Sequence, residues 1–239
     1  MTGGAVEIPV PTLGENPQGF TTATVLLAPD TLLTSWVEGT SAVRVGILDL
    51  SDQTWQLLTG VRGMLRGAVA LPGRRALLLT EYGLFETDLQ TPAVTRRLTA
   101  RIGKHNDEIR HQHDGLVAIG QQAKTTEALV SIATLEYAGR QRRTPAPGRS
   151  IEVAAARAGV ARVLTERGGL LVGATSPRPG EHDQRLLVLD AAREVVVSVA
   201  MPWGVASAHL WRDGLVAAPL RLGRGIPLLA LPVLPGLPV

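Results

Sequence analysis

The segment from His105 to Asp114 is the densest group of side chains in this chain that could do chemistry. It reads His-Asn-Asp-Glu-Ile-Arg-His-Gln-His-Asp and holds three of the five histidines. On a strand, His111 and His113 would point to the same face, which is the spacing that a two-histidine metal clamp needs. Asp107 or Glu108 could add a carboxylate from the preceding loop. These groups would suit a metal-assisted hydrolase or lyase, with the histidines as metal ligands or as an acid/base pair.

The same histidines also allow a structural interpretation. His111 and His113 can hydrogen-bond across a turn that Asp114 caps, since His-x-His alone lacks the number of ligands that a metal site requires. The best third ligand, His209, lies four residues before Asp213 and does not match the register of the other two. The candidate binding residues of the segment are His105, Asp107, Glu108, Arg110, His111 and His113. The candidate metal ligands are His111, His113 and His209, and no cofactor is expected.

The strongest basic stretch is residues 140–149, which read Arg-Gln-Arg-Arg-Thr-Pro-Ala-Pro-Gly-Arg. Together with the pairs Arg74-Arg75 and Arg96-Arg97, it could form a positive rim that binds phosphate groups. Proteins that bind single-stranded nucleic acid also need aromatic platforms, and only Tyr137 is near. A solvated outer strand and loop explains the stretch better, because runs of charge are usually exposed faces. The candidate binding residues here are Arg140, Arg142 and Arg143.

Three aspartates stand at equivalent places, each at the end of a predicted strand: Asp49, Asp88 and Asp190. An aspartate at a strand end, followed by a short polar link, accepts hydrogen bonds from the backbone N–H groups of the turn. We therefore predict that these three carboxylates hold turns together and do no catalysis.

The elements that must position all these side chains recur along the chain. A strand, a tight turn and a second strand return about every 45 residues, and self-similarity at such a period marks a repeat architecture. The alternation of apolar and polar residues has a period near two, which predicts short strands. Residues 154–158 have helical propensity, but the repeat favours a strand and a loop there. The predicted repeats of four antiparallel strands cover residues 20–59, 60–99, 100–147, 148–202 and 203 onward.

The last repeat is one strand short, and a spare strand stands at the other end of the chain. Residues 7–10 (Glu-Ile-Pro-Val) are separated from the first repeat by prolines and glycines. We predict that they pair with the last repeat as its outer strand, which would remove two exposed sheet edges at once. Prolines cannot donate to a ladder, so Pro9, Pro227 and Pro232 are expected on edge strands.

Two sequence patterns resemble those of the β-propeller superfamily, the WD40-like and quinoprotein-like repeat proteins. One is the turn motif Asp-Gly-Leu-Val at 114–117 and 213–216, and the other is the segment Leu-Asp-Leu-Ser-Asp-Gln-Thr-Trp at 48–55. The resemblance covers about 220 residues, and it implies the architecture alone. Without the Trp-Asp and Gly-His pairs of WD40 repeats, no subfamily is assigned and no functional residues are carried over. The expected fold is all-β, a propeller of five four-stranded blades closed by the N-terminal strand, with residues 1–239 as a single domain. Six blades is the alternative, because the long spacing between Asp114 and Gly168 could hide further strands.

Composition narrows the classes of protein that remain. There is no cysteine, which excludes disulfides, zinc–thiolate sites and thiol catalysis. The net charge is only +3, and 24 basic residues include just two lysines, Lys104 and Lys124. This arginine usage indicates a GC-rich genome, and we expect a bacterial source. No secretion signal or uncharged membrane-spanning run is found in the sequence, so we expect a cytoplasmic protein.

The leading hypothesis is a non-catalytic protein-interaction or scaffold module, whose loops bind a protein partner with an acidic surface. We expect a monomer or a subunit of a hetero-complex, with no membrane or nucleic-acid partner. One alternative is a small metal-assisted hydrolase or lyase with its site in the channel mouth. Propeller lactonase-like enzymes are the nearest class, but they hold calcium with several asparagines, and this chain has only Asn16 and Asn106. The second alternative, a nucleic-acid binder that uses the arginine rim, is disfavoured by the low net charge.

Overall fold

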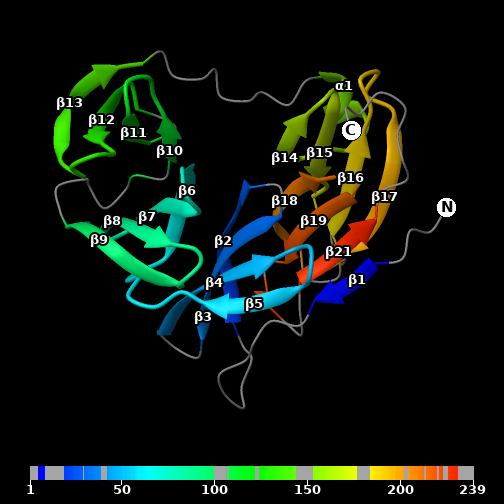
Figure 1. The fold of residues 1–239 in the computed structure, drawn as a ribbon. Helices are drawn as coiled ribbons and strands as arrows, with labels where there is room; N and C mark the ends of the chain where they lie inside the picture. The colour runs from blue at the N-terminus through cyan, green and yellow to red at the C-terminus, as the bar shows by residue number, and fades with distance from the viewer. Residues whose placement is uncertain are drawn as a thin grey trace. The chain divides into compact units, whose positions relative to one another are not determined.

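The described residues of the computed structural model form five antiparallel sheets, four of four strands and one of five (Figure 1). The chain divides into two compact units, Thr22–Gly148 and the combination of Met1–Thr21 with Arg149–Val239. No helix in the described part is long or apolar enough to cross a membrane. The structure describes residues 5–8, 19–28, 30–38, 42–99, 106, 108–121, 124–143, 153–176, 184–201, 204–212, 214–219, 221–222 and 226–230.

The unit Thr22–Gly148 contains three successive sheets, and within each sheet every strand neighbours the next along the chain. They are built from β2 to β5, β6 to β9 and β10 to β13 (Figure 1). The four strands of each lie within one predicted repeat, apart from the first residue of β2. The strands are β2 (Gly19–Ala28), β3 (Thr31–Glu38), β4 (Ala42–Asp49), β5 (Thr54–Leu57), β6 (Leu65–Leu71), β7 (Arg75–Thr80), β8 (Gly83–Asp88), β9 (Ala93–Thr99), β10 (Glu108–His111), β11 (Leu116–Gly120), β12 (Thr126–Ser131) and β13 (Tyr137–Arg142).

Apolar side chains from adjacent sheets form the core of this unit. Leu33 and Val45 of the first sheet pack with Leu78 and Phe85 of the second. A separate cluster joins the other face of the second sheet to the third; it includes Val69, Leu77, Leu84, Ile109, Val117 and Val130. Burying each such side chain contributes about 1.5–3 kcal/mol. The alternation seen in the sequence thus buries both faces of the middle sheet.

Tight turns with left-handed backbone join the first two strands of a sheet. Arg167 pairs with Leu170 across Gly168 and Gly169, whose φ angles are 60° and 82°. These angles are typical of the hairpin turn whose twist matches that of its strands. At the equivalent place in the third sheet, the residues at 114 and 115 have φ angles of 60° and 69°. The recurring turn motif therefore marks hairpins, as the repeat predicts.

The second unit contains two sheets that share one core. The first has the order β14-β15-β16-β17, and the other has the order β1-β21-β19-β18. Buried residues of both sheets, among them Val172, Val188, Leu210 and Leu215, form this core. The two-residue strand β20 pairs with the start of β2. The strands are β14 (Arg162–Arg167), β15 (Leu170–Ala174), β16 (Gln184–Leu189), β17 (Val195–Met201), β18 (Val205–Trp211), β19 (Gly214–Pro219), β20 (Arg221–Leu222), β21 (Ile226–Ala230) and β1 (Ala5–Ile8).

The predicted pairing of the N-terminal segment with the last sheet is confirmed. β1 lies antiparallel to β21 as the outermost strand, with Ala5 opposite Leu229 and Ile8 opposite Ile226. The prediction that Pro227 occupies an edge strand is wrong, because β21 lies between β1 and β19. Its ladder with β19 begins only at Leu228, so the missing N–H of Pro227 removes no bond on that side. Pro9 and Pro232 lie outside the described residues.

The expectation of a strand and loop at 154–158 is wrong, since a short helix, α1 (Val153–Arg157), forms there. Its alanines favour helix, and Gly159 ends it with a left-handed φ of 95°. The N–H of Val160 donates to the carbonyl of Ala155, and that of Gly159 donates to Ala156, which together make a Schellman motif. Ala155 and Val160 are buried against Leu187 and its neighbours in the β14–β17 sheet. The helical propensity of the alanines and this apolar contact therefore favour a helix where the repeat predicted a strand and a loop.

Deletion of residues 1–12 tests the role of β1 in the last sheet. The deletion removes a whole ladder and exposes the edge of β21, so we expect a loss of about 2 kcal/mol, or roughly 5 °C in melting temperature. Differential scanning calorimetry of the shortened and full chains measures it. An unchanged melting temperature would contradict a stabilising role for this pairing.

Candidate functional site

The candidate residues of the β10–β13 sheet lie on two opposite faces. Residues directly opposite each other across an antiparallel pair share a face. Ile109 pairs with Ile119, and both belong to the apolar face that packs on the β6–β9 sheet. Arg110 pairs with Ala118, one residue along, so it lies on the other face. By the same register, this second face also holds Glu108, Glu127 and Gln141. The second face is therefore a polar one.

Glu127 is the centre of the polar face. It belongs to β12, and its side chain is only 1% exposed. Its carboxylate accepts a hydrogen bond from Arg110 Nη2, one from Arg143 Nη1 at 3.0 Å and one from Gln141 Nε2 at 3.0 Å. Gly120 makes room for it, because a Cβ there would lie 3.0 Å from the Glu127 Cγ atom. The carboxylate thus receives donors from β10, from β13 and from the residue that follows β13.

Arg143 extends this network to the first strand of the sheet. It follows β13 directly, and its Nη1 atom also donates to Oε2 of Glu108 on β10, at 2.8 Å. Its Nη2 atom donates to the carbonyl of Gln121 at 3.1 Å. The side chain is 10% exposed, whereas Arg110 is 40% exposed. The largely buried guanidinium of Arg143 therefore connects the end of the last strand, β13, to the first strand, β10.

These contacts shift the pKa values of Glu127 and Arg143 in opposite directions. Burial raises the pKa of Glu127, but the hydrogen bonds from Gln141 and Arg110 and the charges of Arg110 and Arg143 outweigh it and hold this pKa below its usual value. The hydrogen bond to Glu108 raises the pKa of Arg143. Both side chains stay charged at neutral pH. A carboxylate with a lowered pKa is a poor general base and a poor general acid there.

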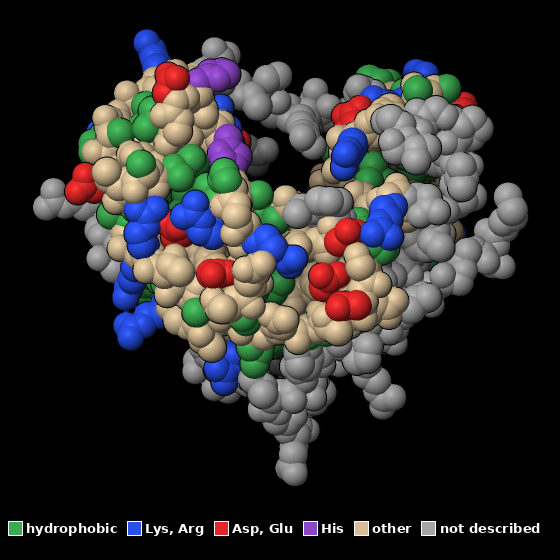
Figure 2. Space-filling model, viewed as in Figure 1, with side chains coloured by type: hydrophobic (Ala, Val, Ile, Leu, Met, Phe, Trp, Pro, Cys, Tyr) green, Lys and Arg blue, Asp and Glu red, His purple; other side chains and the backbone are tan. Residues whose placement is uncertain are grey.

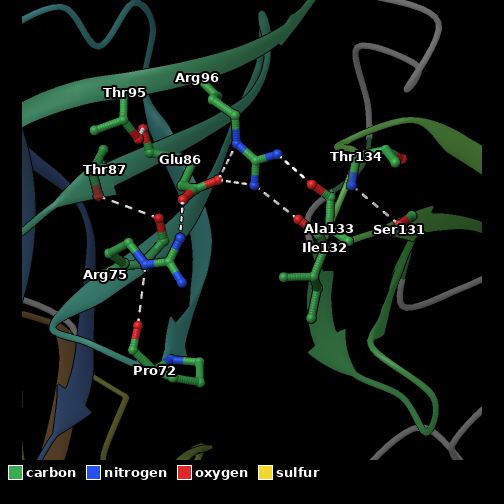
Figure 3. A network of polar contacts seen from close by, with 11 residues as sticks. Pro72, Arg75, Glu86, Thr87, Thr95, Arg96, Ser131, Ile132, Ala133 and Thr134 are labelled. Carbon is green, nitrogen blue, oxygen red and sulfur yellow. Dashed lines mark hydrogen bonds and ion pairs between the residues drawn. The ribbon is translucent and has the colours of Figure 1, made fainter.

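A second buried glutamate lies in the neighbouring sheet (Figure 3). Glu86 of β8 has a side chain that is 3% exposed, and it accepts a hydrogen bond from Arg75 Nη1 on β7 at 2.8 Å and another from Arg96 Nε on β9. Two arginines on the adjacent strands thus neutralise it. As at Glu127, two arginines supply the compensating charge, although here both lie on the adjacent strands.

Arg96 also connects the second sheet to the third. Its Nη2 atom donates to the carbonyl of Ile132 at 2.9 Å, and its Nη1 atom donates to the carbonyl of Ala133 (Figure 3). Arg97, the next residue, lies over the ring of Phe85 at 5.3 Å. The arginines at 75, 96 and 97, which the sequence suggests for a phosphate-binding rim, are therefore engaged in contacts within the protein.

The histidines of the candidate metal clamp do not share a strand. β10 ends at His111, and His113 lies in the following bend. The Nε2–H group of His111 donates to the carbonyl of Ala70 in the neighbouring sheet at 2.7 Å. His209 lies on β18, in the other unit. His105 and Asp107 lie outside the described residues.

The metal hypothesis stays a prediction. Within the part of the chain that the structure describes, no group of three or more His, Asp or Glu side chains could hold a metal ion. Because His105 and Asp107 belong to the remaining part, a ligand set that includes them is untested. The bond from His111 to Ala70 nevertheless gives that histidine a role in joining two sheets.

Two arginines of the basic stretch remain open to solvent. Arg140 and Arg142 lie exposed on β13, and neither makes an ion pair with any described residue. Tyr137, at the start of the same strand, is 57% exposed. On the face that Figure 2 draws, the basic and acidic side chains of the described residues are interspersed rather than separated. Unneutralised positive charge on an outer strand makes β13 the best candidate for a binding surface.

The structural role predicted for the three turn aspartates is confirmed. Oδ1 of Asp49 accepts a hydrogen bond from the backbone N–H of Ser51 at 2.8 Å, and Oδ1 of Asp190 accepts one from Glu194 at 2.9 Å. Asp88 accepts bonds from Gln90 and the following residue, and these bonds lower its pKa. All three carboxylates hold the turn between the third and fourth strands of a sheet.

The sequence did not single out Glu86, Glu127 or Gln141. Each glutamate interrupts a strand that is otherwise mostly apolar or small, and a charge at such a position usually has a buried partner. That signal could have marked both acids, but not their arginines, because the partners lie on other strands at separations that depend on register.

The comparisons with known proteins give structural neighbours only. No protein-family model matches the chain, and no curated protein matches its sequence. It is similar to apo AztD from Citrobacter koseri, with 12% identity over 56% of this chain and 37% of that one, at a TM-score of 0.43. It is also similar to hydrazine synthase from Kuenenia stuttgartiensis, with 14% identity over 86% and 58%, at 0.42.

A third neighbour is the β-propeller domain of Cps50 (Swd1) from Myceliophteria thermophila, with 18% identity over 84% of this chain and 67% of that one, at a TM-score of 0.36. A β-propeller domain is thus among the neighbours. The chain spans 37–59% of the length of the first three neighbours. All these TM-scores lie below 0.5, so the neighbours carry no argument about blade number or activity.

Replacing Glu127 by glutamine tests the polar network. The variant keeps the shape of the side chain but removes the charge that Arg110 and Arg143 share, leaving Glu108 as the remaining acid on Arg143, so we expect a loss of about 2 kcal/mol at neutral pH. Urea unfolding measures it, with the exposed Glu136→Gln as a control of equal charge change. Because the folded pKa lies below the ordinary 4.5, the stabilisation is complete above that value and is lost as the pH falls through the folded pKa. Equal stability of the two variants would contradict the network.

Proposed function

We propose that the protein is a non-catalytic interaction module that binds a protein partner with an acidic surface. One observation carries the proposal: the charged side chains of the candidate site divide into two sets. Arg110 and Arg143 are engaged with Glu127, and Arg143 also pairs with Glu108, all within the sheet. Arg140 and Arg142 are exposed and make no ion pair in the described part of the chain. The first set stabilises the sheet, and the second is free to bind.

The electrostatics of the polar face support binding over catalysis. A general acid or base at neutral pH needs a pKa near neutrality, which usually requires a raised carboxyl pKa. The pKa of Glu127 is lowered by the hydrogen bonds and charges around it, although its burial acts in the opposite direction. The imidazole of His111 is likewise committed to the carbonyl of Ala70. These groups are suited to holding a scaffold together.

We further infer that the sheets act as the five blades of one propeller formed by residues 1–239 and closed by the N-terminal strand. The outer position of β1 beside β21 supports this closure, since it removes an unpaired edge from each strand. A rigid ring of this kind is a stable platform for exposed loops and strands. We propose a cytoplasmic protein that acts as a monomer or as a subunit of a hetero-complex.

Capture and reconstitution test the proposed function. Tagged protein is incubated with extract of the native cell, bound polypeptides are identified, and each is purified and titrated against the protein by calorimetry. We expect at least one polypeptide to bind directly with a Kd of about 1 μM or tighter, the range of specific transient complexes. Failure of every captured polypeptide to bind in purified form would contradict the proposal.

A metal titration tests the alternative function, the metal-assisted hydrolase. A rise of several degrees in melting temperature with a divalent metal, absent in a His113→Ala variant, would favour the metal-assisted hydrolase over the interaction module. We expect the same melting temperature for both proteins with and without metal.

A further inference from the structure

The outer edge of β13 has hydrogen-bonding groups that the sheet does not use. β13 is the last strand in the order β10-β11-β12-β13. The N–H of Arg143 donates to the carbonyl of Thr125, on the β12 side. In an antiparallel pair these groups alternate along the strand, so the N–H and C=O groups of Arg140 and Arg142 face away from β12. The two arginines with exposed side chains therefore also supply the outward backbone groups.

A β-bulge places the exposed tyrosine beside these arginines. Arg142 pairs with Thr126 and Arg140 with Ala128, and the register then shifts so that Tyr137 pairs with Val130. Thr126, Ala128 and Val130 alternate along β12 and so share a face. Their partners on β13 share it too, because residues opposite each other lie on the same side of a sheet. The edge thus presents one aromatic ring and two positive charges in a row.

The positive charges on the edge of β13 determine which kind of strand could pair with it. The nearby acid Glu127 is bound by Gln141 and Arg143, and Arg140 and Arg142 make no ion pair with any residue that the structure describes. Pairing with a second copy of β13 would bring like charges together, which is unfavourable. A strand with acidic side chains would gain instead, because opposite charges facing each other across a pair are stabilising.

The other outer strands differ from β13. The edge of β9 is already partly used, since the N–H of Val94 donates to the carbonyl of Thr59 and Ala93 bridges to that residue. β17 is long and exposed, with Val195 at 43% and Val196 at 37%, but it has no charged side chain. Among the outer strands described, β13 combines open backbone groups with unpaired charge.

We propose that β13 binds an extended acidic segment of the protein partner as an added antiparallel strand. Two acidic residues, at positions i and i+2 of that segment, lie opposite Arg142 and Arg140 respectively, and an apolar residue at i+4 lies against Tyr137. Main-chain hydrogen bonds supply affinity, and the alternate acids supply specificity. This inference rests on the proposed function, and it names the surface and the kind of segment that the surface takes.

Fluorescence anisotropy with labelled eight-residue peptides tests the pattern. One peptide has two glutamates at alternate positions among threonine and valine, and its control has the same composition with the glutamates adjacent. Only the alternate pattern brings both acids to the arginine face, so we expect the control to bind about tenfold more weakly. Equal affinity would overturn the proposal in favour of unspecific attraction between charges.

Backbone methylation distinguishes strand addition from contact through side chains alone. A methyl group on the amides of the two glutamates blocks the bonds to β13, whereas a methyl group on the intervening amide points away from it. We expect the first peptide to lose at least tenfold in affinity and the second to lose less. Equal losses would contradict the added strand.

Matched variants place the site on the protein. Arg140→Glu with Arg142→Glu should abolish binding of the alternate peptide, whereas Arg62→Glu with Lys124→Glu, which makes the same change in net charge at exposed positions, should leave it unchanged. Circular dichroism verifies that both proteins are folded. If a reconstituted partner binds the first variant as tightly as the unchanged protein, this inference fails while the proposed function stands. If no partner reconstitutes, the proposed function itself fails.

Discussion

The compensation of two buried carboxylates is the constraint on which the unit Thr22–Gly148 depends. Removing a carboxylate from water costs several kcal/mol unless donors and opposite charge replace the lost hydration. Glu86 and Glu127 are each almost fully buried, and each lies between two arginines from other parts of its sheet. The positions of those arginines are therefore fixed by the acids that they neutralise. A further consequence is that Arg96 can reach the carbonyls of the next sheet.

This constraint also explains which arginines do not pair with buried acids and so remain available to bind a partner. The chain has 24 basic and 21 acidic side chains, and the sheet architecture decides which guanidinium groups are paired. On β13 the residues alternate, so Gln141 faces Glu127 while Arg140 and Arg142 face the other way. The division between structural and available charge thus follows from the period of a strand. The proposed binding surface on β13 is then a consequence of the same alternation that builds the core.

Much of the architecture could be predicted from the sequence, because strands and turns are local features. Alternating apolar residues gave the strands, and the incomplete last repeat pointed to the pairing of β1 with β21. The helix at Val153–Arg157 was missed because the repeat was weighted above the propensity of its alanines. The polar network was missed for a different reason: Glu127 and Arg143 meet only through the register of β12 and β13, which no local pattern specifies. The metal clamp was an alternative drawn from spacing alone; β10 ends before His113, and a ligand set that includes His105 or Asp107 stays untested.

The titration of the Glu127 carboxyl group tests the central claim most directly. Carbon-detected NMR of the labelled protein follows this group through acidic pH, with Glu127→Gln used to assign its resonance. The structural role predicts a pKa below the ordinary 4.5, because the arginines and Gln141 stabilise the charged form. A pKa above the ordinary value would mean a desolvated carboxyl group without effective partners. That result would contradict the account and make the polar face a candidate for acid/base catalysis.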